Sequence, residues 1–92
     1  MKKIELSRQS AAFLRDIPAK HARQIAEKLD LLARDPDAAP SETLKGYAPM
    51  RRLRAGEYRI IFVAEADFVQ VRLIGKRNDD DIYKALEKLG RK

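Results

Sequence analysis

Residues 57–64, EYRIIFVA, constrain the fold of this chain more than any other stretch. The run is dominated by β-branched and aromatic side chains, which favour strands. An Ala-Gly step precedes it at 55–56 and Glu-Ala-Asp follows it at 65–67; beyond these turns, residues 50–54 and 68–74 are also strand-like. Because short turns join antiparallel neighbours, the sequence predicts a three-stranded antiparallel meander in this half of the chain.

The N-terminal half shows helical patterns after one short strand. Residues 2–6 alternate apolar and charged side chains, which predicts a strand. Ser7 or Ser10 can cap a first helix, and Pro18 ends that helix and opens a second one over residues 19–33, since proline suits a first helical turn. In the second helix apolar side chains recur every three or four residues, which predicts one buried face.

Loops and a last helix complete the expected elements. Residues 35–42, DPDAAPSE, contain two prolines and small polar residues and are expected to form a loop, and Lys45-Gly46 is expected to form a turn. Asn78 is a good helix cap, and the aspartates that follow it fall in the first turn, where the helix dipole favours negative charge. A final helix is therefore expected after Asn78.

Together these elements predict an α+β fold in the order β-α-α-β-β-β-α. We expect a small antiparallel sheet of about four strands, with the two N-terminal helices on one face and a C-terminal helix. A chain of 92 residues is expected to form one domain, residues 1–92. The side chains expected to share the face under the first two helices are Leu53, Tyr58, Ile60, Phe62, Val69, Val71 and Leu73.

Composition excludes several classes of function. The chain has no cysteine and a single histidine, His21, so thiolate metal sites, His-rich zinc sites and histidine triads are excluded, and neither a metal nor a cofactor is expected. His21 is expected at the surface. No apolar run approaches the roughly 18 residues of a membrane span, and the first residues lack the apolar segment of a signal peptide. A cytoplasmic location without membrane attachment is expected.

The charge balance indicates an anionic partner. The chain carries 20 Lys and Arg against 14 Asp and Glu, a net charge of +6. The excess is concentrated between residues 45 and 77, where only Glu57, Glu65 and Asp67 are acidic. The basic residues of this stretch are Lys45, Arg51, Arg52, Arg54, Arg59, Arg72, Lys76 and Arg77.

The strand register decides where the arginines point. If Ala55-Gly56 is the hairpin loop, Arg52 lies opposite Arg59. If the next hairpin closes around residues 64–67, Arg59 also lies opposite Arg72, with Arg54 beside this row. Like charges directly opposite destabilise a sheet by about 0.2–1 kcal/mol per pair. Arginine binds phosphate oxygens in bidentate fashion, so the row is expected to hold a nucleic-acid backbone. A solvated face of mixed charge is the alternative, and a bulge at Gly56 would scatter the row.

The chain contains two segments in order, LRAGEYRIIF and GKRNDDDIY. Through them it resembles the RelE/ParE superfamily of bacterial toxin–antitoxin toxins, and the resemblance covers the whole chain. The resemblance is closest to the RelE-like branch. It implies a ribosome-dependent mRNA endoribonuclease that inhibits translation in the ribosomal A site. In that chemistry the ribose 2′-hydroxyl attacks the scissile phosphate without a metal.

The resemblance also implies roles for particular residues. Arg59 matches the strand arginine and is expected to stabilise the pentavalent phosphorane. Arg77 matches the arginine after the last strand, and Tyr83 matches the helix tyrosine, which would stack on a nucleotide. Arg52 would hold the neighbouring phosphate. Residues expected to support RNA binding are Lys45, Arg51, Arg54, Arg72 and Lys76. A core position for Tyr83 is the alternative.

The chain departs from the family pattern at the expected base. Family members commonly carry two lysines two residues apart, where this chain has Met50 and Arg52. Arginine is effectively never neutral and scarcely acts as a base. Lys45 and Lys76 are the nearest substitutes. Two other functions therefore stay open: a ParE-like DNA gyrase inhibitor without nuclease activity, and a catalytically weak RNA-binding homologue.

The partners implied by the resemblance are the 70S ribosome with mRNA in its A site and a cognate antitoxin, a small protein from the neighbouring gene. The toxin and antitoxin are expected to form a heterodimer or heterotetramer. An acidic or amphipathic antitoxin segment could lie across the basic face or displace the last helix.

Overall fold

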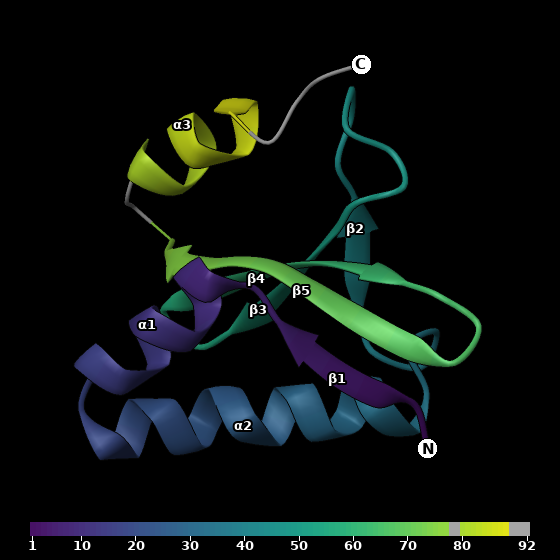
Figure 1. The fold of residues 1–92 in the computed structure, drawn as a ribbon, viewed down its shortest axis with the longest axis horizontal. Coiled ribbons are helices and arrows are strands. Elements are labelled where there is room, and N and C mark those ends of the chain that lie inside the picture. The colour runs from purple at the N-terminus through teal and green to yellow at the C-terminus, as the bar shows by residue number, and fades with distance from the viewer. Residues whose placement is uncertain (78–79, 89–92) are drawn as a thin grey trace.

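A computed structural model describes residues 1–77 and 80–88, which form a five-stranded sheet flanked by three helices (Figure 1). The strand order across the sheet is β1-β5-β4-β3-β2. The elements are β1 (Lys3–Leu6), α1 (Arg8–Asp16), α2 (Ala19–Arg34), β2 (Ser41–Thr43), β3 (Arg51–Ala55), β4 (Tyr58–Ala64), β5 (Phe68–Lys76) and α3 (Asp80–Lys88).

The predicted α+β class and element order are confirmed, with one additional strand. The loop expected over residues 35–42 ends in β2, which pairs antiparallel with β3 at the edge of the sheet. A strand of three residues beside a proline is too short to show an alternating pattern in the sequence. The opposite edge also differs from a purely antiparallel sheet, because β1 pairs with β5 in parallel.

The helix boundaries follow the expected capping chemistry. Ser7 is the N-cap of α1, and its hydroxyl accepts a hydrogen bond from the backbone N–H of Ser10 at 3.1 Å. Pro18 separates α1 from α2, as expected. The proposed cap Asn78 lies outside the described residues.

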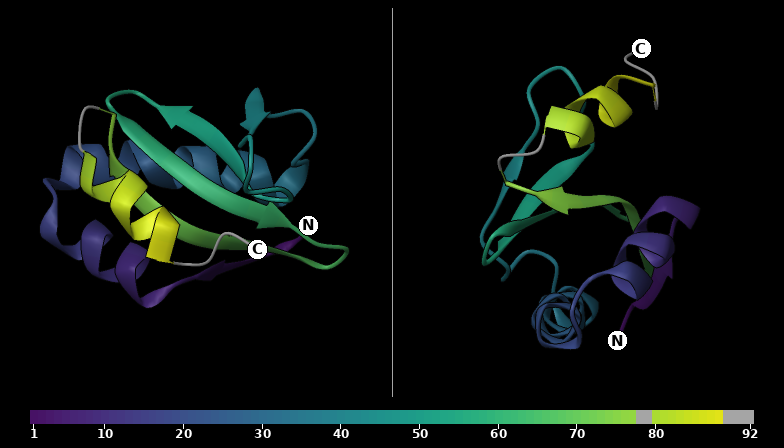
Figure 2. Two further views of the ribbon diagram at one scale, coloured as in Figure 1. Left: turned by 90° about the horizontal axis from the view of Figure 1, so that it is seen from above. Right: turned by 90° about the vertical axis from the view of Figure 1, so that its left-hand side faces the viewer.

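The helices form two layers on opposite faces of the sheet (Figure 2). Helices α1 and α2 cover one face, where Ile25, Leu29 and Leu32 of α2 join the buried strand residues. Helix α3 covers the other face, where Leu86 packs with Met50, Ile61, Val63 and Leu73. The predicted core face is therefore correct except for Leu73, which lies under α3.

A β-bulge explains the misplaced leucine. Ile61 pairs with Leu73 but Phe62 pairs with Val71, so the register between β4 and β5 shifts by one residue at Arg72. The shift moves Leu73 to the α3 face and puts Ile74 in the core beneath α1 and α2.

The β3–β4 hairpin closes one residue later than expected. Ala55 pairs with Tyr58, so the loop residues are Gly56 and Glu57 rather than Ala55 and Gly56. Gly56 has φ +61°, and positive φ is found at no non-glycine residue among those described. A glycine with positive φ at the first loop position is typical of a type II′ turn, which selects this register.

Candidate nucleic-acid interface

Arginine side chains from β3 and β4 meet on the α3 face of the sheet. Leu53 is buried beneath α2, so its neighbours Arg52 and Arg54 point to the opposite face. In the observed register Arg54 lies directly opposite Arg59, and Arg52 lies opposite the buried Ile61. The expected Arg52–Arg59 pair is therefore replaced by an Arg54–Arg59 pair, but these three arginines do share one face.

The guanidinium of Arg59 is anchored to the hairpin backbone. Its Nη1 donates to the carbonyl oxygen of Gly56 at 3.0 Å and to that of Tyr58 at 2.8 Å. The side chain is half-buried. On β5 the residue opposite Arg59 is Gly75 rather than the expected Arg72. Because glycine has no side chain, the strand beside Arg59 carries no group that projects from the sheet there.

Glu42 supplies countercharge that the sequence did not predict. Its Oε2 lies 2.6 Å from Arg52 Nη2, and its Oε1 lies 3.8 Å from Arg54 Nη2. Glu42 belongs to β2 and pairs with Arg52 in the ladder, which brings the carboxylate over the arginines. A pocket of about 360 Å³ is found here, lined by Pro40, Ser41, Glu42, Arg52 and Arg54.

Arg72 lies on this face but outside the expected row. It occupies the bulge of β5, and its Nη1 donates to Gln70 Oε1 at 2.9 Å. Gln70 pairs with Val63, which is buried under α3. The bulge therefore separates Arg72 from Arg59, contrary to the predicted direct pairing of the two.

Arg51 lies on the opposite face of the sheet, contrary to its grouping with the interface. Its guanidinium stacks 5.2 Å from the ring centre of Phe62 and pairs with Asp37 at 3.4 Å. Its Nε donates to Ser41 Oγ at 3.0 Å. Arg51 pairs with Phe62 across the ladder and lies two residues before the buried Leu53, so the alternation of side chains along β3 puts it on the α1/α2 face in either register.

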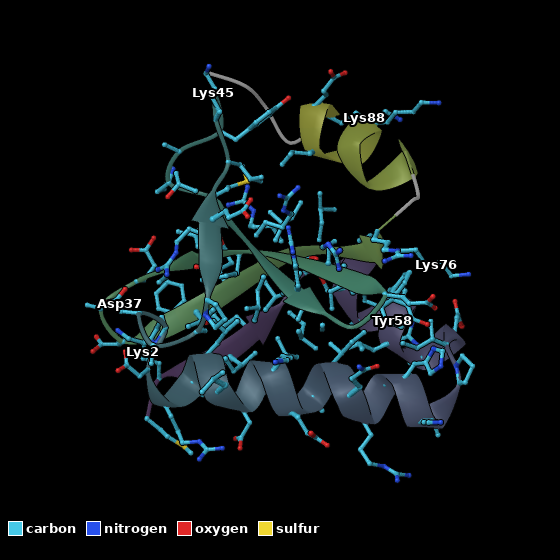
Figure 3. The ribbon with its side chains drawn as sticks, turned by 180° about the vertical axis from the view of Figure 1, so that it is seen from behind. Lys2, Asp37, Lys45, Tyr58, Lys76 and Lys88 are labelled. Carbon is cyan, nitrogen blue, oxygen red and sulfur yellow. The ribbon has the colours of Figure 1, made fainter. Side chains whose placement is uncertain are left out.

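The remaining predicted interface residues are spread over the molecule. Lys45 lies in the turn between β2 and β3, and Lys76 lies at the end of β5 on the other side of the molecule (Figure 3). Lys76 is still part of β5, rather than following it, and pairs with Tyr58. Arg77 is exposed, and its backbone N–H donates to the carbonyl of Glu57 at 2.7 Å, beside the hairpin that carries Arg59. Tyr83 belongs to α3, but its side chain lies outside the description.

Two further residues, Met50 and His21, bear on which group could act as the general base. Met50 is 7% exposed and packs under Leu86 of α3, so this position belongs to the core. His21, expected at the surface, is half-buried and its Nδ1 forms a hydrogen bond with the hydroxyl of Tyr58. Tyr58 is buried on the α1/α2 face, so His21 lies on the side of the sheet away from the arginines.

The described part of the chain contains no group of three or more acidic, histidine or cysteine residues arranged to hold a metal ion. Within the same residues, none of the helices has the length and apolar character needed to span a membrane.

Comparison with known proteins gives the family. The model of the family described as "ParE toxin of type II toxin-antitoxin system, parDE" matches residues 4–81. The chain therefore belongs to the ParE toxin family and is a type II toxin–antitoxin toxin of the RelE/ParE superfamily. No curated protein sequence matches it.

Solved structures from both branches of the superfamily share the fold. An E. coli RelE toxin with two arginine-to-alanine substitutions, in the free state, is 19% identical, with coverage of 96% of each chain and a TM-score of 0.74. RelE in the RelE–RelB complex of Pyrococcus horikoshii is 20% identical (84% of this chain, 96% of that chain, TM-score 0.68). A chain of the chromosomal ParDE system of P. aeruginosa is 17% identical (83% and 96%, TM-score 0.70).

Proposed function

We propose that this toxin is a ribosome-dependent mRNA endoribonuclease that inhibits translation. The observation that carries the proposal is the cross-strand pair of Arg54 and Arg59, with Arg52 on the same face. Juxtaposed like charges oppose folding, whereas a phosphodiester backbone would be bound by them. The proposed partner is mRNA in the A site of the 70S ribosome.

Each arginine has a distinct proposed role. Arg59 is anchored by two backbone carbonyls, and a preorganised cation is what a developing phosphorane charge requires. Arg77 follows β5 and is held to the same hairpin through Glu57, so it is assigned to the leaving 5′-oxygen. Arg52 is assigned to the neighbouring phosphate, and Tyr83, on α3, to stacking on a nucleotide.

The proposed reaction is attack of the ribose 2′-hydroxyl on the adjacent phosphorus, with departure of the 5′-oxygen. The thioether of Met50 is not a base, and His21 lies on the other side of the sheet, so neither residue can take the hydroxyl proton at this face. Stabilisation of the transition state by arginines is thus proposed as the main catalytic contribution. A missing general base typically costs about 10²–10⁴-fold in rate, so we expect slow cleavage compared with relatives that have one.

The test is to express the protein in a translating lysate and map the 5′ ends of messenger fragments. Cuts in phase with ribosome positions support the proposal. Loss of the cuts when translation is blocked shows that the ribosome is required, whereas cuts in naked messenger contradict that requirement.

A gyrase inhibitor without nuclease activity is the second candidate, and the match to the ParE family favours it. It predicts intact messenger together with gyrase-dependent DNA breaks. A catalytically weak RNA-binding toxin, favoured by the buried Met50, predicts that both messenger and DNA stay intact while RNA is bound.

A cognate antitoxin is the other proposed partner. Several solved relatives are toxin–antitoxin complexes, including RelE–RelB from Methanococcus jannaschii and the intact RelBE complex of E. coli. We propose that the pair forms a heterodimer or heterotetramer, which light scattering of the co-expressed proteins would test. A toxin that stays monomeric beside its neighbour-encoded protein would contradict it.

A further inference from the structure

The pocket between β2 and β3 places the carboxylate of Glu42 against two cations. Arg52 and Arg54 project from β3 into it, and the carboxylate of Glu42 reaches both, at 2.6 Å and 3.8 Å. One carboxylate thus spans two guanidinium groups, and each of its oxygens faces a different arginine. A phosphate group presents the same kind of oxygens to arginine and carries them at similar spacing.

The carboxylate is exposed to solvent although it is paired. The side chain of Glu42 is 59% exposed; its pair with Arg52, which is 23% exposed, is close at 2.6 Å, whereas its pair with the exposed Arg54 at 3.8 Å contributes little because water screens it. The strand that carries Glu42 has three residues and pairs only with β3. A short edge strand gives the carboxylate few constraints beyond its ladder hydrogen bonds and the pair with Arg52. A phosphate that takes its place forms a charge-assisted pair with the same arginine, so the exchange restores the contact that is lost.

We infer that this pocket is a phosphate-binding site for an RNA backbone and that Glu42 is its built-in competitor. The carboxylate occupies the position of a phosphate in the free protein and moves aside when RNA binds. Its charge lowers the affinity for any nucleotide backbone, which restricts binding to RNA held in place by further contacts. This inference rests on the proposed RNA-directed function and adds Glu42 to it as the residue that sets affinity.

The experiment uses the full chain and two probes: inorganic phosphate, and a short 2′-O-methyl oligoribonucleotide, which lacks the attacking hydroxyl. Glu42→Gln removes the competing charge and keeps the side-chain shape. Glu27→Gln, at an exposed position on α2 behind the sheet, changes the net charge by the same amount and serves as control. Dissociation constants are measured by calorimetry, and circular dichroism checks each fold.

Glu42→Gln is expected to lower the dissociation constants of both probes about fivefold, the effect of a unit charge about 4 Å away in water. Glu27→Gln is expected to leave both dissociation constants close to those of the unmodified protein. In the double variant Glu42→Gln, Arg54→Gln the gain should disappear. Equal affinities for the two glutamine variants would overturn the inference, as would the absence of phosphate binding in every variant.

The two probes separate the possible ligands. Tighter binding of phosphate alone would indicate a site for a free anion and overturn the assignment to an RNA backbone. This binding test is independent of the cleavage test of the proposed function, because neither probe is cleaved. Cleavage in a lysate with no effect of Glu42→Gln leaves the nuclease and removes this site; the opposite result leaves the site and removes the nuclease.

Discussion

Arg54 and Arg59 lie directly opposite each other on β3 and β4, on the face that α3 covers. The relationship results from the turn at Gly56, because closing the loop one residue earlier would put Arg59 opposite Arg52. In both registers two arginines oppose each other at this end of the hairpin.

Replacement of Arg54 by Gln is expected to stabilise the protein. Removing one of two opposed like charges should raise the free energy of unfolding by about 0.2–1 kcal/mol at low ionic strength. The loss of the exposed contact with Glu42 at 3.8 Å offsets little of this gain. Urea denaturation at low and high salt measures the effect, which should shrink as salt screens the repulsion. A destabilised Arg54→Gln protein at low salt would contradict this account.

Arg51 and Arg54 should separate stability from RNA binding. They are three positions apart on one strand, and because side chains alternate along a strand they point to opposite faces. Arg51→Ala removes the contact with Phe62 and the hydrogen bond to Ser41, which should cost about 1–2 kcal/mol of unfolding free energy and leave RNA affinity unchanged.

Arg54→Ala should do the reverse of Arg51→Ala. It should weaken binding of the 2′-O-methyl oligonucleotide and lower the slope of log affinity against log salt by about 0.7, the value for one single-strand phosphate contact. Filter binding over a salt series, alongside urea denaturation, measures both quantities. If Arg51→Ala kept its fold but bound RNA more weakly, the interface would include the α1/α2 face, which contradicts the proposed site.

Alanine at either positive-φ glycine should destabilise the fold. Gly56 and Gly46 have φ +61° and +84°, a conformation that costs about 1–2 kcal/mol for residues with a Cβ. At Gly56 the added Cβ would also meet Gln24 Nε2 at 2.4 Å, while at Gly46 nothing lies within 4 Å. Gln24 is exposed and can rotate away, so the two variants should lose similar stability in thermal denaturation. An unchanged melting temperature for Gly56→Ala would argue against the type II′ turn.

Local chemistry made much of this fold predictable from the sequence. Ser7 caps α1 through a hydrogen bond three residues away, and Pro18 separates two helices by its own geometry. Ile25, Leu29 and Leu32 repeat at helical spacing and are buried together, as expected. These features depend on neighbours within one or two turns, so the sequence displays them directly.

Features that depend on pairing between distant segments were not predictable in the same way. The choice between Ala55 and Gly56 as the first loop residue changes every cross-strand partner in the hairpin by two residues, so Arg59 lies opposite Arg54 instead of Arg52. The bulge at Arg72 depends on how β4 and β5 twist together, and it moved Leu73 to the α3 face. Glu42 looked like part of a proline-bounded loop and gave no signal of its contact with Arg52.

Cleavage by Arg59→Ala in a translating lysate tests the central claim most directly. Arg23→Ala, an exposed arginine on α2, removes the same charge from the other side of the molecule and serves as control. Loss of one preorganised donor is expected to slow cleavage by about 10²–10³-fold, with circular dichroism and the denaturation midpoint showing a folded protein, while Arg23→Ala cuts at the normal rate. Cleavage at the normal rate by folded Arg59→Ala would contradict the account.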